Sequence, residues 1–448
     1  MKSVLVLILL EIKIIVLLSI ASQLNIMAHE NHIPVGRRYA VVYYGGSNDY
    51  VTRVVLERNY TIVIAEPYFV IPKEWKERGI QVYVYLNILG LPIEKLDWVK
   101  KNHPEWILYT KEGKPAKYWF GNYFMCNIAI KSYQDYLINK AKEYLRKGFT
   151  GIFLDDVPLD ITKKNPLYDM PVYNETKYGK WIDALILFLK RLKNETGVPI
   201  LYNTGWGAPS PELMKILDGA LIEFYLSAWR GNPWKNPEYY YRPWHEILKV
   251  SLEAQKYAEK GKIIITLSYG DRPEIYEYTY ATARLFDFYY WISRPIIDRI
   301  LDAKVLDIDL GNPLGKYKHY KNIYFRIYEK GLVAVNPYSR RYTVEIQVPS
   351  DWLELVRING EVYKVNNGKL RITLGPQEGM VLLLRRTGKP TQVEEGELQL
   401  PKTTIWSTLV KLLRERTAEV TSLLIALATL TAIVVDYRSR RRIKRGIS

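Results

Sequence analysis

Cysteine and histidine are scarce in this chain of 448 residues. Cys126 is the single cysteine, and there are five histidines. One cysteine cannot form an intramolecular disulfide, which excludes a disulfide-stapled scaffold and a cysteine-based metal site. The histidines are scattered without an i,i+4 pair, so a multi-histidine metal cage is not expected either. We therefore predict that the protein works without a metal ion or another cofactor.

Acidic residues are also few relative to basic ones, 47 against 64, and the net charge is +17. Part of the excess is a tail: residues 436–448 carry six basic side chains and one acidic one. The remaining basic residues mostly alternate with glutamate, as in residues 73–78, which is typical of a solvated, ion-paired surface. We expect no nucleic-acid partner, although such a binder remains an alternative that rests on charge alone. The abundance of Lys, Arg, Glu, Ile and Tyr with little Met suggests a heat-adapted source.

Segments typical of export and membrane insertion lie near the two ends of the chain. Residues 1–21 combine an early lysine, two apolar runs and a small-x-small site, which predicts a signal peptide, with an uncleaved anchor as the alternative. Residues 420–435 contain no charge, and as a helix they would cover about 24 Å of a ~30 Å hydrocarbon core. We predict a transmembrane helix over 418–436 and a basic cytoplasmic tail over 437–448, which places the rest of the chain outside the cell membrane.

Residues 387–417 link the body to this helix and have a composition typical of a stalk. Three matches to the N-glycosylation pattern begin at Asn59, Asn174 and Asn194, and an exported chain would make them plausible sites.

The body between residues 36 and 312 alternates short apolar runs with longer segments of helical period. Seven runs are continuous rather than alternating, which predicts parallel strands buried on both faces: 40–44, 60–65, 81–86, 151–154, 198–202, 220–225 and 262–267. We expect a helix over 275–291 and an eighth strand near 296–305. Gly45-Gly46-Ser47 is not a phosphate-binding fingerprint, so the size and pattern favour a (β/α)8 TIM barrel over a doubly wound sheet. Residues 317–386 read as a small all-β sandwich, because short strands are separated by turn signals such as Asn359-Gly360.

Polar residues close the predicted barrel strands, where TIM barrels carry their reactive groups. Asp155 and Asp156 follow the fourth run, and Glu223 lies in the sixth. Other strand ends add carboxyl, amide and aromatic side chains that we expect to bind substrate: Tyr44, Glu66, Tyr85, Asn87, Asn203, Trp206, Tyr225 and Tyr269. Converging carboxylates with aromatic faces meet the needs of glycosidic-bond hydrolysis. Each carboxylate alone could instead be a helix cap or a buried ion-pair partner.

The segment Gly148-Phe-Thr-Gly-Ile-Phe-Leu-Asp-Asp-Val157 resembles the GxDGxxLD signature of polygalactosaminidase-like and related glycoside hydrolases, TIM-barrel members of the amylase-like assemblage. Residues 218–223 are similar to the sixth strand of that group. The resemblance covers about residues 39–310 and implies Asp155 as nucleophile and Glu223 as acid/base. The chain departs from the signature at Thr150, and Asp156 after Asp155 leaves two candidates for the nucleophile.

Together these features predict an extracellular, membrane-anchored glycoside hydrolase that cleaves a polysaccharide or a cell-surface glycan with two carboxylates and a retaining mechanism. The alternative is an inactive carbohydrate-binding or cell-envelope scaffold with the same fold.

Overall fold

The computed structural model describes residues 37–118, 121–163, 168–232 and 235–385. The predicted signal peptide, stalk, transmembrane helix and basic tail lie outside these residues. Within the described ranges, no helix combines the length and apolar character needed to cross a membrane.

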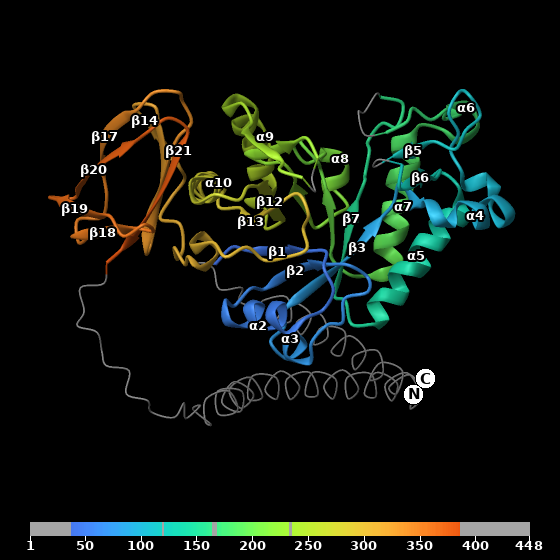
Figure 1. Ribbon diagram of the computed structural model, residues 1–448, viewed down its shortest axis with the longest axis horizontal. Coiled ribbons are helices and arrows are strands. Elements are labelled where there is room, and N and C mark those ends of the chain that lie inside the picture. Colours follow the sequence, from blue (N-terminus) through green and yellow to red (C-terminus); the bar gives the residue numbers. More distant parts are fainter. Residues whose placement is uncertain (1–36, 119–120, 164–167, 233–234, 386–448) are drawn as a thin grey trace, which may run out of the picture. The chain divides into compact units, whose positions relative to one another are not determined.

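Eight parallel strands form the first sheet, and each corresponds to a short apolar run whose side chains are largely buried. In sheet order they are β1 (Ala40–Tyr43), β2 (Ile62–Ala65), β3 (Gln81–Asn87), β7 (Gly151–Asp155), β8 (Ile200–Asn203), β9 (Gly219–Ile222), β12 (Ile263–Tyr269) and β13 (Tyr289–Ser293) (Figure 1). A parallel bridge between Tyr39 and Tyr290 joins the first strand to the last, and the Tyr290 amide donates to the Arg38 carbonyl at 2.9 Å. The sheet therefore closes on itself, which confirms the predicted TIM barrel.

Helices surround the barrel: α2 (Asp49–Glu57), α3 (Lys73–Glu77), α5 (Lys131–Arg146), α7 (Trp181–Thr196), α8 (Pro211–Met214), α9 (Trp244–Ala258) and α10 (Pro273–Leu285). Helix α7 buries Leu185, Phe188 and Leu192 on one face, at the spacing that the helical period requires. It ends where Gly197 adopts a left-handed conformation with φ of 67°.

The eighth strand is not where the sequence predicted it. The helix expected over 275–291 stops at Leu285, Asp287 has a left-handed backbone with φ of 61°, and β13 follows immediately. Residues 296–305 contain no strand. The prediction failed because the aromatic run of β13 continues the apolar pattern of α10, and only the turn at Asp287 separates them.

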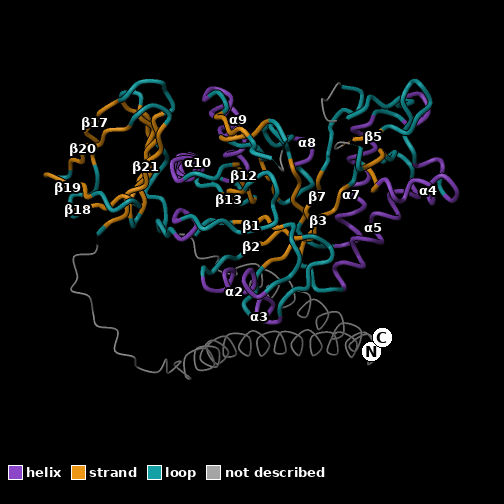
Figure 2. Tube along the Cα trace, in the orientation of Figure 1, coloured by secondary structure: helices purple, strands orange, loops and turns teal. Residues whose placement is uncertain are grey.

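Three insertions extend the C-terminal ends of the strands (Figure 2). Between β3 and α5 lie a three-stranded sheet and a helix, β4 (Gly90–Pro92), β5 (Lys117–Tyr118), β6 (Tyr123–Met125) and α4 (Leu96–Asn102), with 3-10 turns at 93–95 and 104–106. The short helix α6 (Glu175–Tyr178) precedes α7, and a hairpin of β10 (Ser227–Arg230) and β11 (Glu238–Tyr241) follows β9. Gly90 permits the close approach of β4 to β6, since a Cβ there would lie 1.9 Å from the Phe124 carbonyl oxygen.

After a 3-10 turn (Lys304–Asp307) the chain forms a second, antiparallel sheet. Its order is β14 (Lys318–Tyr320), β15 (Ile323–Tyr328), β16 (Gly331–Asn336), β21 (Glu378–Leu384), β18 (Glu354–Arg357), β19 (Val362–Asn366), β20 (Lys369–Leu374) and β17 (Tyr342–Gln347). Side chains alternate along β15 and β16: Phe325 and Leu332 pack in the core of this domain, while Tyr324 and Val333 belong to the core that also contains the barrel. The chain therefore forms an all-antiparallel β domain after the barrel, with a second core of its own.

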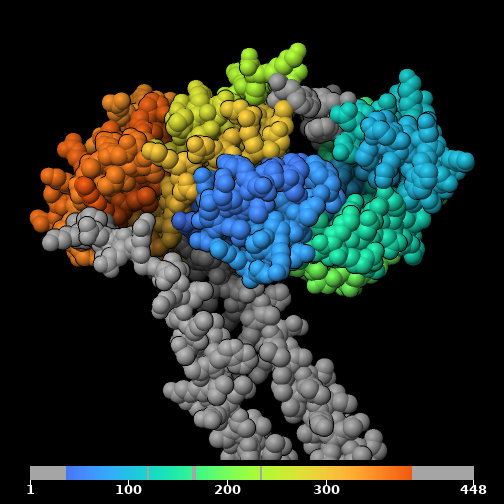
Figure 3. Space-filling view, turned by 60° about the horizontal axis from the view of Figure 1, so that its bottom comes forward, coloured from blue at the N-terminus to red at the C-terminus, as the bar shows by residue number. Residues whose placement is uncertain are grey.

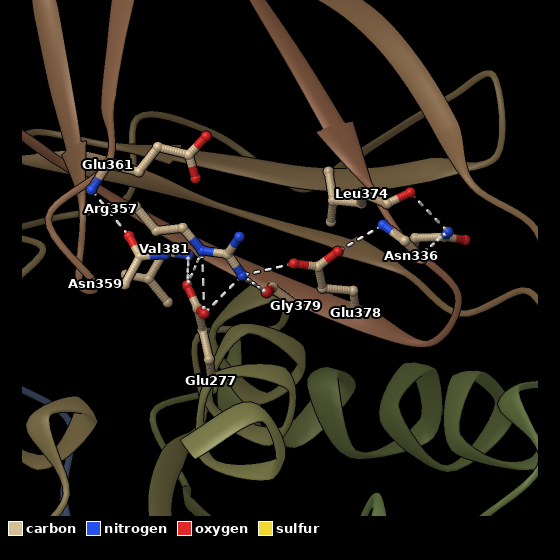
Figure 4. A network of polar contacts seen from close by, with 10 residues as sticks. Glu277, Asn336, Arg357, Asn359, Glu361, Leu374, Glu378, Gly379 and Val381 are labelled. Atoms are coloured by element: carbon tan, nitrogen blue, oxygen red, sulfur yellow. Dashed lines mark hydrogen bonds and ion pairs between the residues drawn. The ribbon is translucent and has the colours of Figure 1, made fainter.

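Helix α10 lies between the barrel strands and β21 (Figure 1), and the orange β domain contacts the yellow part of the barrel in Figure 3. The Arg357 guanidinium binds the Glu277 carboxylate with Nε–Oε1 and Nη2–Oε2 distances of 3.0 and 2.8 Å (Figure 4). The same carboxylate accepts from the Val381 amide at 2.8 Å. Gly379 allows the contact, because a Cβ there would lie 2.4 Å from the Tyr278 Cα.

Candidate active site

Three neighbouring barrel strands bring two carboxylates and one amide together. Asp155 is the last residue of β7, Asn203 is the last residue of β8, and Glu223 directly follows β9. Since β8 pairs with both β7 and β9, Asn203 lies between the two acids. All three side chains are partly buried.

Asn203 bonds to both carboxylates through the same nitrogen. Its Nδ2 donates to Asp155 Oδ1 at 2.9 Å and to Glu223 Oε2 at 2.6 Å. These two oxygens are therefore at most about 5.5 Å apart. The Gly205 amide donates to Asn203 Oδ1 at 2.8 Å, which fixes the orientation of the side-chain amide. Carboxyl groups about 5–5.5 Å apart are typical of retaining glycosidases, whereas inverting pairs are about 6.5–9.5 Å apart.

Two tyrosines hold the remaining carboxylate oxygens. The Tyr85 hydroxyl donates to Asp155 Oδ2 at 2.8 Å, and the Tyr269 hydroxyl donates to Glu223 Oε1 at 2.5 Å. Burial and nearby carboxylates raise the pKa of both tyrosines well above its ordinary value, so they remain neutral donors. Each oxygen of the pair thus has one fixed donor.

The environment favours a proton on Glu223. Burial raises the pKa of Glu223, and the negative charge of Asp155 raises it further, while the bonds from Tyr269 and Asn203 oppose part of this shift. A carboxylic acid with a raised pKa can act as a general acid near neutral pH.

Asp156 points to a different set of partners. It has a left-handed backbone with φ of 51°, and its oxygens accept from Asn87 Nδ2 at 2.6 Å and from the Tyr168 hydroxyl at 2.9 Å. The Tyr118 hydroxyl donates to Asn87 Oδ1 at 2.8 Å. Burial and the charge of Asp155 raise the pKa of Asp156.

Tyr44 and Glu66 complete this side of the site. The ring of Tyr44 meets that of Tyr85 edge-on, with centroids 5.1 Å apart. Glu66 follows β2, and burial together with the charge of Asp155 raises its pKa to about 7.

No group of three or more His, Cys, Asp or Glu in the described part of the chain is arranged to hold a metal ion.

Trp206 follows β8 and remains 45% exposed. Its ring stacks on Phe224, with centroids 4.8 Å apart and planes at 19°. Phe224 in turn contacts the Tyr269 ring at 5.1 Å. Ring contacts thus connect Trp206 through Phe224 to Tyr269, whose hydroxyl bonds to Glu223.

Tyr225 is not part of the site, contrary to the sequence prediction. Its side chain is fully buried, and its hydroxyl lies 2.5 Å from Ser251 Oγ on helix α9. The left-handed turn at Phe224, with φ of 50°, changes the direction of the chain between Glu223 and Tyr225. Tyr269 lies at the site, but only 2% of it is exposed, so it offers a hydroxyl rather than a ring face for stacking.

Three residues at the site were not predicted: Tyr118, Tyr168 and Arg242. Tyr118 ends the short strand β5 and Tyr168 lies in the insertion after β7, and the only sequence signal for either was the general abundance of tyrosine. Arg242 is 5% exposed, and its guanidinium donates to the carbonyls of Trp206 at 3.0 Å and Phe224 at 3.1 Å. Nothing in the local sequence distinguishes it from a surface arginine.

Solved structures with related architecture include glycoside hydrolases, and no curated protein matches this chain. The glycoside hydrolase domain of PelA from Pseudomonas aeruginosa is 18% identical with a TM-score of 0.46, over 60% of this chain and 99% of that domain. An Anoxybacillus alpha-amylase is 13% identical with a TM-score of 0.47, over 80% of this chain and all of the amylase. The maltogenic alpha-amylase AmyB from Thermotoga neapolitana is 12% identical with a TM-score of 0.43, over 77% and 99% of the two chains.

The barrel sequence also matches a protein-family model. The model described as hypothetical glycosyl hydrolase family 15 matches residues 80–332, which is more than half of the chain and includes Asp155, Asn203 and Glu223. The predicted enzyme class is thereby confirmed, and the chain belongs to this family of glycoside hydrolases.

Proposed function

We propose that the protein is a retaining glycoside hydrolase in which Asp155 is the nucleophile and Glu223 is the acid/base. The observation that carries this proposal is the shared Asn203 nitrogen, which keeps the two carboxylates within about 5.5 Å. At this separation Asp155 can attack the anomeric carbon directly, because there is no room for an intervening water. Asp156 is the weaker candidate for the nucleophile, since its oxygens bind Asn87 and Tyr168, whereas the Asn203 amide that holds Glu223 binds Asp155.

In the first step, protonated Glu223 donates its proton to the glycosidic oxygen as the bond to the anomeric carbon breaks. Asp155 forms an ester with that carbon, so the substrate's configuration is inverted once. In the second step Glu223, now ionised, takes a proton from water, and the water oxygen displaces Asp155. The second inversion returns the starting configuration.

The substrate class that fits is a polysaccharide or a cell-surface glycan. The family suggests a glycan, and the surroundings of the pair supply both kinds of sugar contact. Asn87, Asp156 and Glu66 offer polar groups for hydroxyls, and Trp206 offers a ring that is 45% exposed. We assign Tyr44 and Tyr85 to the same binding surface.

We further propose that this domain acts outside the cell and is tethered to the membrane through residues 418–436. The support is the charge pattern of the sequence, with apolar residues 420–435 followed by six basic residues. Protease added to intact cells should release a soluble active fragment by cutting within 387–417. An enzyme that stays protected until the cells are lysed would contradict this topology.

The test of the activity is a screen of the purified full-length protein against a panel of polysaccharides and oligosaccharides. Reducing ends should appear with one of them, and Asp155→Asn and Glu223→Gln should each lower kcat by at least a thousandfold. Asp271→Asn is the matched control, because Asp271 also follows a barrel strand but is exposed. Binding of a glycan without turnover by the native chain would instead favour the inactive scaffold.

A further inference from the structure

The two sides of the carboxylate pair differ in chemistry. On the Asp155 side, strands β1, β2, β3 and β7 contribute Tyr44, Glu66, Asn87 and Asp156. On the Glu223 side, the loops after β8 and β9 contribute an aromatic surface, Trp206 stacked on Phe224, which packs on the buried ring of Tyr269 at the end of β12. One side is therefore suited to sugar hydroxyls, and the other to the face of a ring.

The aromatic surface is connected directly to the proposed acid. Phe224 follows Glu223 in the chain, and Tyr269 donates its hydroxyl to Glu223 Oε1. A proton from Glu223 goes to the oxygen of the leaving group. A sugar that departs after this protonation therefore lies on the Glu223 side of the site, within reach of the exposed ring of Trp206.

The position of Trp206 is fixed by buried groups rather than by its own exposed loop. Phe224 keeps a left-handed backbone with φ of 50°, which is unusual for a bulky side chain and strained. Arg242 holds the two loops together, since its Nη2 donates to the Trp206 carbonyl and its Nη1 to the Phe224 carbonyl. Its guanidinium carbon also lies 5.1 Å from the centroid of the Trp206 ring. The strain at Phe224 is thus compensated by contacts that present Trp206.

We propose that Trp206, stacked on Phe224, forms the binding subsite for the leaving-group sugar and makes the enzyme selective for a saccharide rather than a small leaving group. This inference rests on the proposed function. It also gives the orientation in which the substrate binds: the sugar that becomes attached to Asp155 lies toward Tyr44 and Asp156. The leaving sugar lies over Trp206.

The experiment compares two substrates that share one sugar. One is the oligosaccharide identified by the panel, and the other is the glycosyl fluoride of its non-reducing sugar, whose fluoride leaves without a ring to stack and without needing a proton. For Trp206→Ala we expect kcat/KM on the oligosaccharide to fall roughly tenfold or more, in line with the loss of an aromatic contact. Fluoride release should fall by less than twofold.

Two further variants make the result specific. Trp206→Phe keeps a ring and should recover most of the activity on the oligosaccharide. Trp98→Ala removes another exposed tryptophan, 48% accessible and located on α4, and should alter neither rate.

Equal losses on both substrates would overturn the inference, because Trp206 would then act on the first sugar or on the chemistry. Unchanged rates on both would overturn it as well. If the native enzyme releases neither fluoride nor sugar, the proposed function itself is wrong, which is a distinct outcome.

Discussion

At the scale of single residues, hydrogen bonds set the protonation of the catalytic pair. Tyr269 stabilises the ionised form of Glu223 and lowers its pKa against the opposing effect of burial. In the Tyr269→Phe variant this bond is absent, so the pKa of Glu223 should rise further. If Glu223 is the acid, the alkaline limb of the pH–kcat/KM profile should move to higher pH. A limb that stays in place would show that another group sets it.

Glu66 supplies a second residue-scale prediction. Its pKa is raised from 4.5 to about 7 by burial and by Asp155, so the folded state binds its proton more tightly than the unfolded state does. The contribution of Glu66 to the free energy of unfolding should therefore fall as pH rises from about 4.5 to about 7 and then level off.

The Glu66→Gln variant has no carboxylate to ionise at this buried position. It should therefore be more stable than the native protein at pH 8 by roughly 1–3 kcal/mol. Near pH 4 the two proteins should differ little. Urea titrations at both pH values measure the difference, and an equal difference at both would contradict the account.

In a TIM barrel the reactive groups lie at the C-terminal ends of the strands. This rule was sufficient to predict from the sequence that Asp155, Asn203 and Glu223 lie close together. It failed for Tyr225, because the direction of that side chain depends on the left-handed turn at Phe224. Such a conformation is rare for phenylalanine and has no sequence signal. The contacts of Asp156 with Tyr168 also could not be predicted, since they join a strand end to an irregular loop.

At the scale of elements, helix α10 connects the barrel to the β domain. The carboxylate of Glu277 is mostly buried beneath β18 and β21, where it binds Arg357 and the Val381 amide (Figure 4). Removing one partner of a buried ion pair leaves the other charge uncompensated, at a cost of about 3–5 kcal/mol.

We expect Arg357→Met to lower the free energy of unfolding by about 3 kcal/mol. Arg385→Met is the matched control: Arg385 lies just after β21 and binds Glu354 at 3.1 Å, but it is 56% exposed. That variant should lose less than about 1 kcal/mol. Equal effects of the two substitutions in denaturant titrations would mean that the α10 contact contributes little.

The strands and helices were predicted correctly where a loop separates one apolar run from the next. The prediction failed where no such loop is present. The seven expected barrel strands overlap the observed ones, while the eighth was assigned to the wrong residues. Phe286, Asp287 and Phe288 form the whole connection from α10 to β13. A connection of this length between two aromatic segments is invisible to hydrophobic periodicity.

At the scale of the whole molecule, one face of the β domain's sheet packs in the same core as the barrel, while its other face forms a core of its own. Tyr324, Tyr328 and Val333 of the β domain belong to the same buried cluster as the barrel strands. The sequence predicted two domains in order, but their shared core depends on contacts between residues about a hundred positions apart, such as Glu277 and Val381.

Because of this shared core, the two parts should unfold together. Calorimetry of the full chain should show a single transition for the barrel and the β domain, and Arg357→Met should lower its midpoint without splitting it. Two separate transitions in the native protein would contradict a common cooperative unit.

The central claim, that this family member hydrolyses glycosides through Asp155 and Glu223, is tested most directly by trapping the covalent intermediate. The 2-deoxy-2-fluoro glycosyl fluoride of the sugar identified by the panel should inactivate the enzyme, and peptide mass spectrometry should locate one glycosyl adduct on Asp155. An adduct on Asp156, or turnover with no adduct and an inverted product, would contradict the mechanism.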